Sequence, residues 1–207
     1  MARPTPGKIV CVGRNYAAHA RELGNEVPDR PLLFFKPPSA VIAVGEPIRL
    51  PAVSERVDHE AEIALVIGRR ARRVAATDAM AHVAGIACAN DVSARDLQKL
   101  DGQWARAKGF DTFCPLGEIV RNGFDWDQLE IIGRVNGEVR QHGHVRDMIF
   151  PFPELIATIS AIMTLEPGDV ILTGTPEGVG PLAPGDTVEV EIPGVATLAN
   201  PVLSDDA

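Results

Sequence analysis

The sequence has few cysteines and no long apolar run, and each shortage excludes a class of protein. Its three cysteines, Cys11, Cys88 and Cys114, lie far apart and form no CxxC or Cys/His zinc spacing. They therefore predict buried thiols in a reducing compartment, not a disulfide framework. No uncharged apolar run reaches the roughly 18 residues of a membrane-spanning helix, and no apolar signal region begins the chain. We expect a soluble, cytoplasmic protein without a membrane partner.

The sequence also has fewer basic than acidic residues. Lys and Arg number 20 against 28 Asp and Glu, which gives a net charge of −8. This balance excludes general binding of nucleic acid, which requires a basic face, but a local pocket can still bind a small anion. The Gly-rich segment Thr173–Gly180 lacks the spacing of a phosphate-binding P-loop.

The remaining composition predicts one folded domain over residues 1–207. Of these residues 45% are hydrophobic, and no repeat or long linker divides them. Pro and Gly separate many short β-branched runs, and only a few short helices are expected, without regular βαβ alternation. Asn136-Gly137 predicts a tight hairpin between the strands 131–135 and 138–141. The pattern indicates a β-rich α+β fold with a mixed, mostly antiparallel sheet.

Two glutamates mark the start of a short apolar strand that ends at Gly68. Glu60 and Glu62 stand two positions apart, so a strand projects both side chains to the same face. Neighbouring carboxylates repel one another unless a cation lies between them, and a hard divalent metal prefers such oxygen ligands. The alternative is a solvated strand end with two exposed glutamates.

Further polar side chains stand at predicted strand ends and on short predicted helices. Asp91 follows the strand 85–90, and His19 shares a helix face with Glu22 at a spacing of three residues. Each of these side chains has a surface role as its alternative.

The other predicted local structure concerns four segments. A helix from Ser93 to Gln98, with Ser93 as its cap, would place Arg95 and Gln98 on one face. Residues 77–84 are predicted as a short capped helix, 103–111 as a loop and 36–39 as a turn.

The combination resembles the fumarylacetoacetate hydrolase family over nearly the whole chain. Five motifs in order carry the resemblance: Gly13–His19, His59–Glu62, Asp91–Gln98, Lys108–Phe110 and Leu172–Gly180. Within the family the chain looks most like the short, single-domain branch of acylpyruvases and oxaloacetate decarboxylases. The resemblance implies a mixed β-roll with a few short helices, usually a homodimer, with one Mg²⁺ or Mn²⁺ held by Glu60, Glu62 and Asp91.

The resemblance also implies roles for the remaining candidates. His19, oriented by Glu22, would activate water, and its helix would close over the bound ligand as a lid. Thr175 would bind the pyruvoyl end of a small anionic oxo-acid substrate, whose carboxylate and oxygens would be received by Arg95, Gln98 and Lys108. The first expectation is hydrolysis of the C–C bond of acylpyruvates. The alternatives are oxaloacetate decarboxylation, keto–enol tautomerisation or isomerisation of an unsaturated oxo-acid, and a non-catalytic protein that binds metal and ligand.

Overall fold

The apolar strands of the sequence form two five-stranded sheets that pack face to face. The computed structural model of the chain describes residues 5–205. The first sheet has the order β2-β1-β12-β6-β7. Its strands are β1 (Ile9–Gly13), β2 (Leu32–Lys36), β6 (Ala61–Ile67), β7 (Val83–Asn90) and β12 (Val170–Leu172). Most neighbours are antiparallel, but β1 and β12 run parallel, as the predicted mixed sheet requires.

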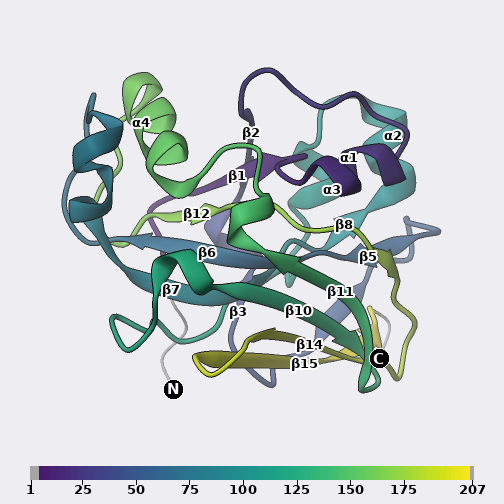
Figure 1. Cartoon of the computed structure of the whole chain (residues 1–207). Helices are drawn as coiled ribbons and strands as arrows, with labels where there is room; N and C mark the ends of the chain where they lie inside the picture. Colours follow the sequence, from purple (N-terminus) through teal and green to yellow (C-terminus); the bar gives the residue numbers. More distant parts are fainter. Residues whose placement is uncertain (1–4, 206–207) are drawn as a thin grey trace.

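The second sheet has the order β11-β10-β14-β15-β4 and lies below the first in Figure 1. Its strands are β4 (Ile48–Leu50), β10 (Glu130–Val135), β11 (Glu138–His144), β14 (Thr187–Ile192) and β15 (Ala196–Ser204). Side chains from both sheets, such as Ile63 and Leu65 of β6 and Val190 of β14, share one buried core. The predicted hairpin is confirmed, because β10 pairs with β11 and both Asn136 and Gly137 have positive φ.

Short strands close the first sheet into a roll. The strand β3 (Val41–Ile42) pairs with β9 (Cys114–Pro115), and Leu116 bridges to Ala89 of β7. Because β2 continues through the 3₁₀ helix η1 (Pro38–Ala40) into β3, the chain connects the two edges of the sheet. Inside this roll Cys11, Ala64 and Cys114 belong to a second buried core. The remaining strands form a three-stranded sheet in the order β13 (Gly180–Pro181), β5 (Val57–His59) and β8 (Ser93–Ala94).

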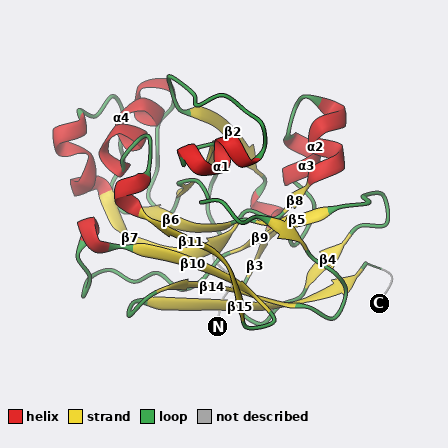
Figure 2. Cartoon of the chain, turned by 45° about the vertical axis from the view of Figure 1, so that its right-hand side comes forward, coloured by secondary structure: helices red, strands yellow, loops and turns green. Residues whose placement is uncertain are grey.

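The helices are short and lie on one side of the sheets (Figure 2). They are α1 (Ala17–Glu22), α2 (Arg95–Asp101), α3 (Ala105–Lys108) and α4 (Phe152–Ile162), with 3₁₀ helices η2 (Ala76–His82), η3 (Trp126–Gln128) and η4 (Val145–Asp147). Figure 1 shows α1, α2 and α3 grouped together, and α4 at the other end of the molecule. No helix among residues 5–205 has both the length and the apolar character needed to cross a bilayer.

Four local predictions were wrong. Ser93 is not a helix cap: it lies in β8, and α2 begins at Arg95 after an N-cap residue, Ala94, that supplies no side-chain bond. The predicted loop 103–111 contains α3, and the predicted helix 77–84 is the 3₁₀ helix η2. Lys36 belongs to β2 and not to a turn, because its long side chain is buried inside the roll.

Candidate metal centre and active site

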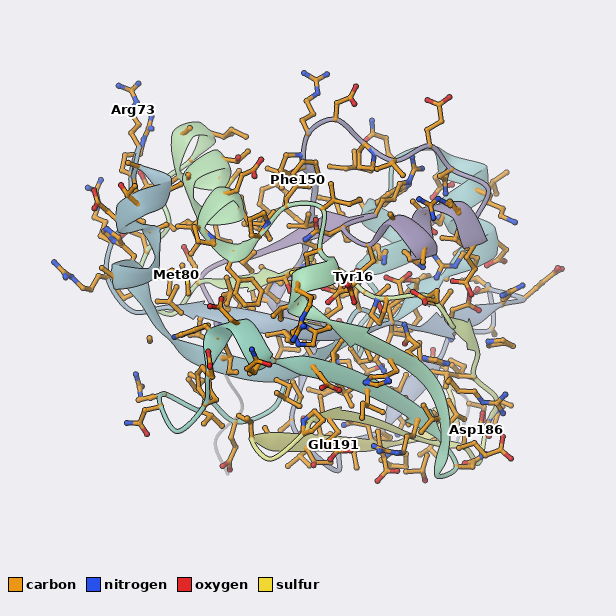
Figure 3. The ribbon with its side chains drawn as sticks, viewed as in Figure 1. Tyr16, Arg73, Met80, Phe150, Asp186 and Glu191 are labelled. Atoms are coloured by element: carbon orange, nitrogen blue, oxygen red, sulfur yellow. The ribbon has the colours of Figure 1, made fainter. Side chains whose placement is uncertain are left out.

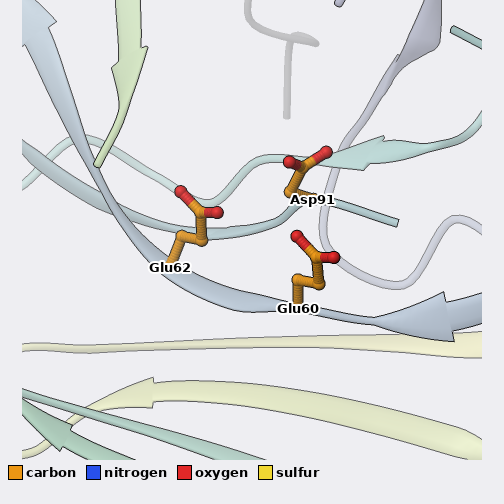
Figure 4. A group of neighbouring side chains, drawn as sticks. All are labelled: Glu60, Glu62 and Asp91. Carbon is orange, nitrogen blue, oxygen red and sulfur yellow. The ribbon is translucent and has the colours of Figure 1, made fainter. Parts of the chain in front are cut away.

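Three carboxylates meet at one end of the first sheet. Glu60, Glu62 and Asp91 each offer an oxygen atom, and these atoms all lie within 4.8 Å of one another. Figure 4 shows the three side chains converging on one space from two segments of backbone. Glu60 is 4% exposed, Glu62 2% and Asp91 0%. The solvated strand end that the sequence left open is therefore wrong, because both glutamates are buried.

The register of the sheet explains this convergence. Ala61 pairs with Asn90, and the amide of Asp91 donates to the carbonyl of Glu60 at 2.9 Å, so Glu60 and Asp91 stand opposite each other just beyond β6 and β7. Glu62 lies two positions after Glu60 and faces the same side of β6. Its Oε2 accepts a 2.7 Å hydrogen bond from the amide of Gly174. Gly174 has φ +104 and lies against Asn15, where a Cβ would approach within 2.6 Å, so this position requires glycine.

Two buried lysines hold Asp91 and Glu60. Lys108 Nζ, at the end of α3, lies 2.9 Å from Glu60 Oε2 and 2.7 Å from Asp91 Oδ2. Lys36 Nζ lies 2.6 Å from Asp91 Oδ1 and 3.0 Å from the carbonyl of Val92. Both oxygens of Asp91 are thus bound by ammonium groups, which compensates for burying the carboxylate.

Arg95 is held between Glu60 and one further carboxylate, that of Asp58. Its Nη2 donates to Glu60 Oε1 at 2.6 Å, and its Nε donates to Asp58 Oδ2 at 3.0 Å. Its Nη1 donates to Gln98 Oε1 at 2.7 Å, so the predicted pair on one helix face is present. Arg95 therefore reaches a substrate only with N–H groups that these bonds leave free, whereas no residue between 5 and 205 accepts a hydrogen bond from the amide NH₂ of Gln98.

The charges set opposite protonation preferences for the two glutamates. Burial alone would raise the pKa of Glu60, but Lys108 and Arg95 outweigh it and lower that pKa below its ordinary range. Burial and the nearby charges of Asp91 and Glu60 raise the pKa of Glu62 well above its ordinary range. Burial opposes the charged form of Lys108, yet Asp91 and Glu60 raise its pKa, so Lys108 is an ammonium at neutral pH.

Two more predicted residues approach the same space from α1. His19 Nδ1 lies 3.3 Å from Glu22 Oε2, and Glu22 Oε1 accepts a 2.9 Å hydrogen bond from the amide of Gly178. Among residues 5–205 the other ring nitrogen of His19, Nε2, has no hydrogen-bond partner. The carboxylate thus orients the imidazole and leaves Nε2 to exchange a proton.

Thr175 stands just beyond β12, and its hydroxyl proton is already donated to a backbone carbonyl. Its Oγ1 donates to the carbonyl of Ala61 at 2.8 Å and accepts from Gln141 Nε2 at 2.7 Å. Thr175 therefore ties β12 to β6 and to β11. If Thr175 binds a substrate, its hydroxyl does so as an acceptor.

All nine predicted site residues line one cavity of about 510 Å³. They are His19, Glu22, Glu60, Glu62, Asp91, Arg95, Gln98, Lys108 and Thr175. The structure thus brings every one of them to one place, and their chemical roles stay predictions. The cavity lining also includes Arg14, Arg56, Lys99 and Trp104, to which sequence reasoning gave no role.

The donor set fits a hard divalent cation. Glu62 is a buried carboxylate that faces two others, and among the described residues it forms no salt bridge of its own. A divalent cation between Glu60, Glu62 and Asp91 would offset the repulsion that raises the pKa of Glu62. Carboxylate oxygens alone, without His or Cys, favour Mg²⁺ or Mn²⁺ over zinc.

Sequence reasoning missed the residues that support this centre. Lys36, Asp58 and Gln141 are each at most 1% exposed and bond directly to predicted site residues. A signal existed for Lys36, because a lysine that ends the apolar run 32–35 cannot be buried without an acidic partner. No comparable signal marks Asp58 or Gln141, whose partners among the predicted site residues, Arg95 and Thr175, lie 37 and 34 positions away.

Comparisons with known proteins agree on a single family. The family model described as Fumarylacetoacetate (FAA) hydrolase C-terminal matches residues 8–203. Oxaloacetate tautomerase FAHD1, a mitochondrial protein of Arabidopsis thaliana, is 50% identical over 195 residues, which cover 91% of this chain and 87% of the relative.

Two solved structures are similar to this chain over nearly its whole length. The 5-carboxymethyl-2-hydroxymuconate delta-isomerase from Mycobacterium smegmatis has a TM-score of 0.90 and 50% identity, and the match covers 97% of this chain and 80% of that one. The 2-hydroxyhepta-2,4-diene-1,7-dioate isomerase from Mycobacterium marinum has a TM-score of 0.90 and 48% identity, with 98% and 77% covered.

Proposed function

The chain belongs to the fumarylacetoacetate hydrolase family, and we propose that it is a metal-dependent enzyme that interconverts the keto and enol forms of a short 2-oxo acid such as oxaloacetate. The observation that carries the proposal is the arrangement of the cavity. Three carboxylates that fit a divalent cation, an ammonium and an oriented imidazole all line it. The names of the similar tautomerase and isomerases support this chemistry above the hydrolysis that we expected first.

The reaction moves one proton and breaks no carbon–carbon bond. Keto–enol conversion removes a proton from the carbon beside the keto group and returns one to the oxygen, or the reverse. A divalent cation bound by Glu60, Glu62 and Asp91 would act as a Lewis acid toward the negative charge that develops on the substrate's oxygens.

The protein's own groups supply the remaining functions. His19 carries the proton, since Glu22 holds its Nδ1 and leaves Nε2 free. Lys108 is charged and fixed between Glu60 and Asp91, so it stabilises negative charge and does not act as a base. Gln98 directs its free NH₂ group to a substrate oxygen, while Arg95 fixes Gln98 and Glu60.

The test follows enol and pyruvate in the same sample. Oxaloacetate enriched in its enol form is mixed with the protein and Mg²⁺, the decay of enol absorbance is recorded, and pyruvate is measured enzymatically. We expect accelerated enol decay without pyruvate release, and His19→Asn should slow it by about 10²- to 10⁴-fold. Pyruvate released in step with enol loss would indicate decarboxylation instead. Enol decay no faster than in buffer would overturn the proposal.

Acylpyruvate hydrolysis is the second candidate, favoured by the dyad of His19 and Glu22. An imidazole oriented by a carboxylate can activate water as well as carry a proton. Acetylpyruvate and fumarylpyruvate, assayed under the same conditions for pyruvate release, test this activity. His19→Ala should remove hydrolysis more severely than decarboxylation, since only hydrolysis requires an activated water. Ligand binding without turnover of any of these substrates would favour a non-catalytic binding protein.

A further inference from the structure

One buried glutamine reaches from the second sheet to the strand that carries the glutamates. Gln141 lies in β11 and is 1% exposed. Its Oε1 accepts from the amide of Ala61 at 2.9 Å and lies 3.0 Å from His59 Nδ1. Its Nε2 donates to Thr175 Oγ1 at 2.7 Å and to the carbonyl of Pro176 at 2.8 Å. The side-chain amide thus uses all of its hydrogen-bonding capacity, and its two backbone partners fix which end is oxygen and which is nitrogen.

Three of these contacts close a hydrogen-bonded ring around the backbone of Ala61. The amide of Ala61 donates to Gln141, and Gln141 donates to Thr175. The hydroxyl of Thr175 then donates to the carbonyl of Ala61 at 2.8 Å. All donors point the same way round, so each bond supports the next. Because Ala61 stands between Glu60 and Glu62, the hydrogen-bonded ring fixes the backbone that joins the two glutamates.

The hydrogen-bonded ring stands where the pairing of β6 with β12 ends. The register of these strands finishes where Leu172 pairs with Ala64, and the chain then turns at Gly174, whose φ is +104°. Among the described strands, Ala61 pairs only with Asn90 of β7, on its other side. A buried backbone group without a partner costs about 1–3 kcal/mol. Two side chains of the hydrogen-bonded ring therefore take the place of the missing strand.

Glycines in the hairpin of β10 and β11 allow this close approach. Gly133 pairs with Gln141, and a Cβ on Gly133 would come within 3.1 Å of the glutamine's Oε1. A Cβ on Gly143 would come within 2.7 Å of Pro176 and 3.2 Å of Tyr16. In Figure 3, Tyr16 lies just above β11. The hairpin thus packs closely over the segment that Gln141 bonds.

The backbone between two metal ligands matters more for a small cation than for a large one. Mg²⁺ requires near-ideal octahedral geometry with oxygens at about 2.0–2.1 Å, whereas Ca²⁺ accepts a flexible set of oxygens at about 2.3–2.6 Å. The side chain of Glu60 is held by Lys108 and Arg95, and that of Glu62 by the amide of Gly174. With the side chains held, the stiffness of the intervening backbone decides how far the site can widen.

We propose that Gln141 is a positioning residue for the metal centre, and that its hydrogen-bonded ring with Ala61 and Thr175 sets the affinity for Mg²⁺ relative to Ca²⁺. The inference rests on the proposed function, which assigns the three carboxylates to a divalent cation. Gln141 does not line the described cavity, and among residues 5–205 it bonds to no carboxylate. It acts on the ion through the backbone of Ala61.

The test measures metal affinity by calorimetry on the whole chain, without substrate and at one pH. Protein is freed of metal with EDTA, the EDTA is removed, and Mg²⁺ and Ca²⁺ are titrated separately. The readout is the Kd for Ca²⁺ divided by the Kd for Mg²⁺. Gln141→Met keeps an unbranched side chain and removes all four contacts, whereas Gln141→Glu keeps the shape and removes only the two donors. Because both ions carry the same charge, the ratio cancels most of the effect of the added carboxylate.

Thr175 offers a second place to open the hydrogen-bonded ring. Thr175→Val removes the hydroxyl and keeps the shape, and Thr175→Ser is the conservative variant that keeps the hydroxyl. Gln128→Met is the matched control, because Gln128 is exposed in η3 and its amide oxygen accepts from Arg146. Circular dichroism and urea titration confirm the fold of each variant.

We expect Gln141→Met to weaken Mg²⁺ binding by at least about tenfold, as the loss of a group that supports metal ligands does, and Ca²⁺ binding by less than about threefold. The Kd ratio should therefore fall by at least about threefold in Gln141→Met, and it should also fall in Gln141→Glu and Thr175→Val. Thr175→Ser should keep most of the ratio, and Gln128→Met should not change it. A role in overall stability alone would leave the ratio as it is.

The outcomes separate this inference from the proposed function. A ratio that is unchanged in Gln141→Glu and Thr175→Val would overturn the role of Gln141, whatever the enzyme catalyses, and these two variants decide the matter if Gln141→Met does not fold. If no oxo acid is turned over but the ratio depends on Gln141, the positioning role stands and the proposed reaction falls. If the unmodified protein binds neither ion, the metal assignment and the role of Gln141 both fail.

Discussion

Lys36 Nζ lies 2.6 Å from Asp91 Oδ1, and neither side chain is exposed to solvent. The two residues come from opposite edges of the first sheet, because Lys36 ends β2 and Asp91 follows β7. Closure of the roll brings them together. Since Lys108 binds the other oxygen of Asp91, two ammonium groups fix the orientation of one predicted metal ligand.

Replacing Lys36 should therefore destabilise the fold. Lys36→Met removes the charge but keeps an unbranched side chain, and it leaves one oxygen of a buried carboxylate without its partner. We expect a loss of about 3 kcal/mol in the free energy of unfolding, measured by urea titration in EDTA. Lys99→Met is the control: Lys99 is exposed, so its loss should stay within about 0.5 kcal/mol. Equal stability of the two variants would show that Lys36 does not support Asp91.

Glu62→Gln should separate metal binding from folding. Glutamine keeps the shape of Glu62 and the acceptor for the amide of Gly174, but it removes one of the three charges. We expect Mg²⁺ or Mn²⁺ affinity, measured by calorimetry, to fall by at least about tenfold, since even the loss of groups that only support metal ligands costs this much. Activity should fall with it, and EDTA should inactivate the unmodified protein. Glu55→Gln, an exposed carboxylate, should bind the metal normally.

The raised pKa of Glu62 predicts a pH dependence of stability. A carboxyl whose pKa is higher in the folded than in the unfolded chain favours folding below its ordinary pKa of 4.5. That contribution is lost as the pH rises through the raised value. In EDTA, the Tm of the unmodified protein should therefore fall relative to that of Glu62→Gln as the pH rises from 4.5 to the raised pKa, and the difference should stay constant at higher pH.

Metal binding should reverse this effect and release protons. Because the cation favours ionised Glu62, Mg²⁺ should raise Tm more at high than at low pH. Titrations in two buffers with different ionisation enthalpies count the protons released. A Tm difference between the unmodified protein and Glu62→Gln that does not vary with pH would contradict the assignment.

The three cysteines should be inert in the native protein. Burial raises the pKa of Cys88 and of Cys114 to about 12 and that of Cys11 above its ordinary value. The reactive thiolate is therefore scarce at neutral pH, and all three side chains are enclosed. We expect no reaction with a disulfide reagent before unfolding and three equivalents after it. Fast modification of the native chain would exclude this explanation.

Much of the fold follows from local patterns. The strand after Glu62 and the hairpin at Asn136-Gly137 were predicted because each depends on neighbours in sequence. The local errors occur where distant contacts decide the structure. Ser93 has the side chain of a helix cap, yet its hydroxyl lies 2.8 Å from the carbonyl of Asp91 and 3.2 Å from Glu60 Oε1, and its one proton serves these acceptors. Tertiary contacts thus replaced the local capping bond.

The sequence by itself determined the candidate metal ligands, because the alternation of a strand aligns Glu60 with Glu62, and the five ordered motifs, which include Asp91, carry the resemblance to the family. Only the tertiary structure decided how the cations are used. Among residues 5–205 it pairs Arg95, Lys108 and Lys36 with buried carboxylates, and it places Arg14 over the Trp104 ring without a hydrogen bond or an ion pair. The physical reason is that the energy of a charge depends on its burial and on partners from distant segments, which spacing along one strand does not reveal.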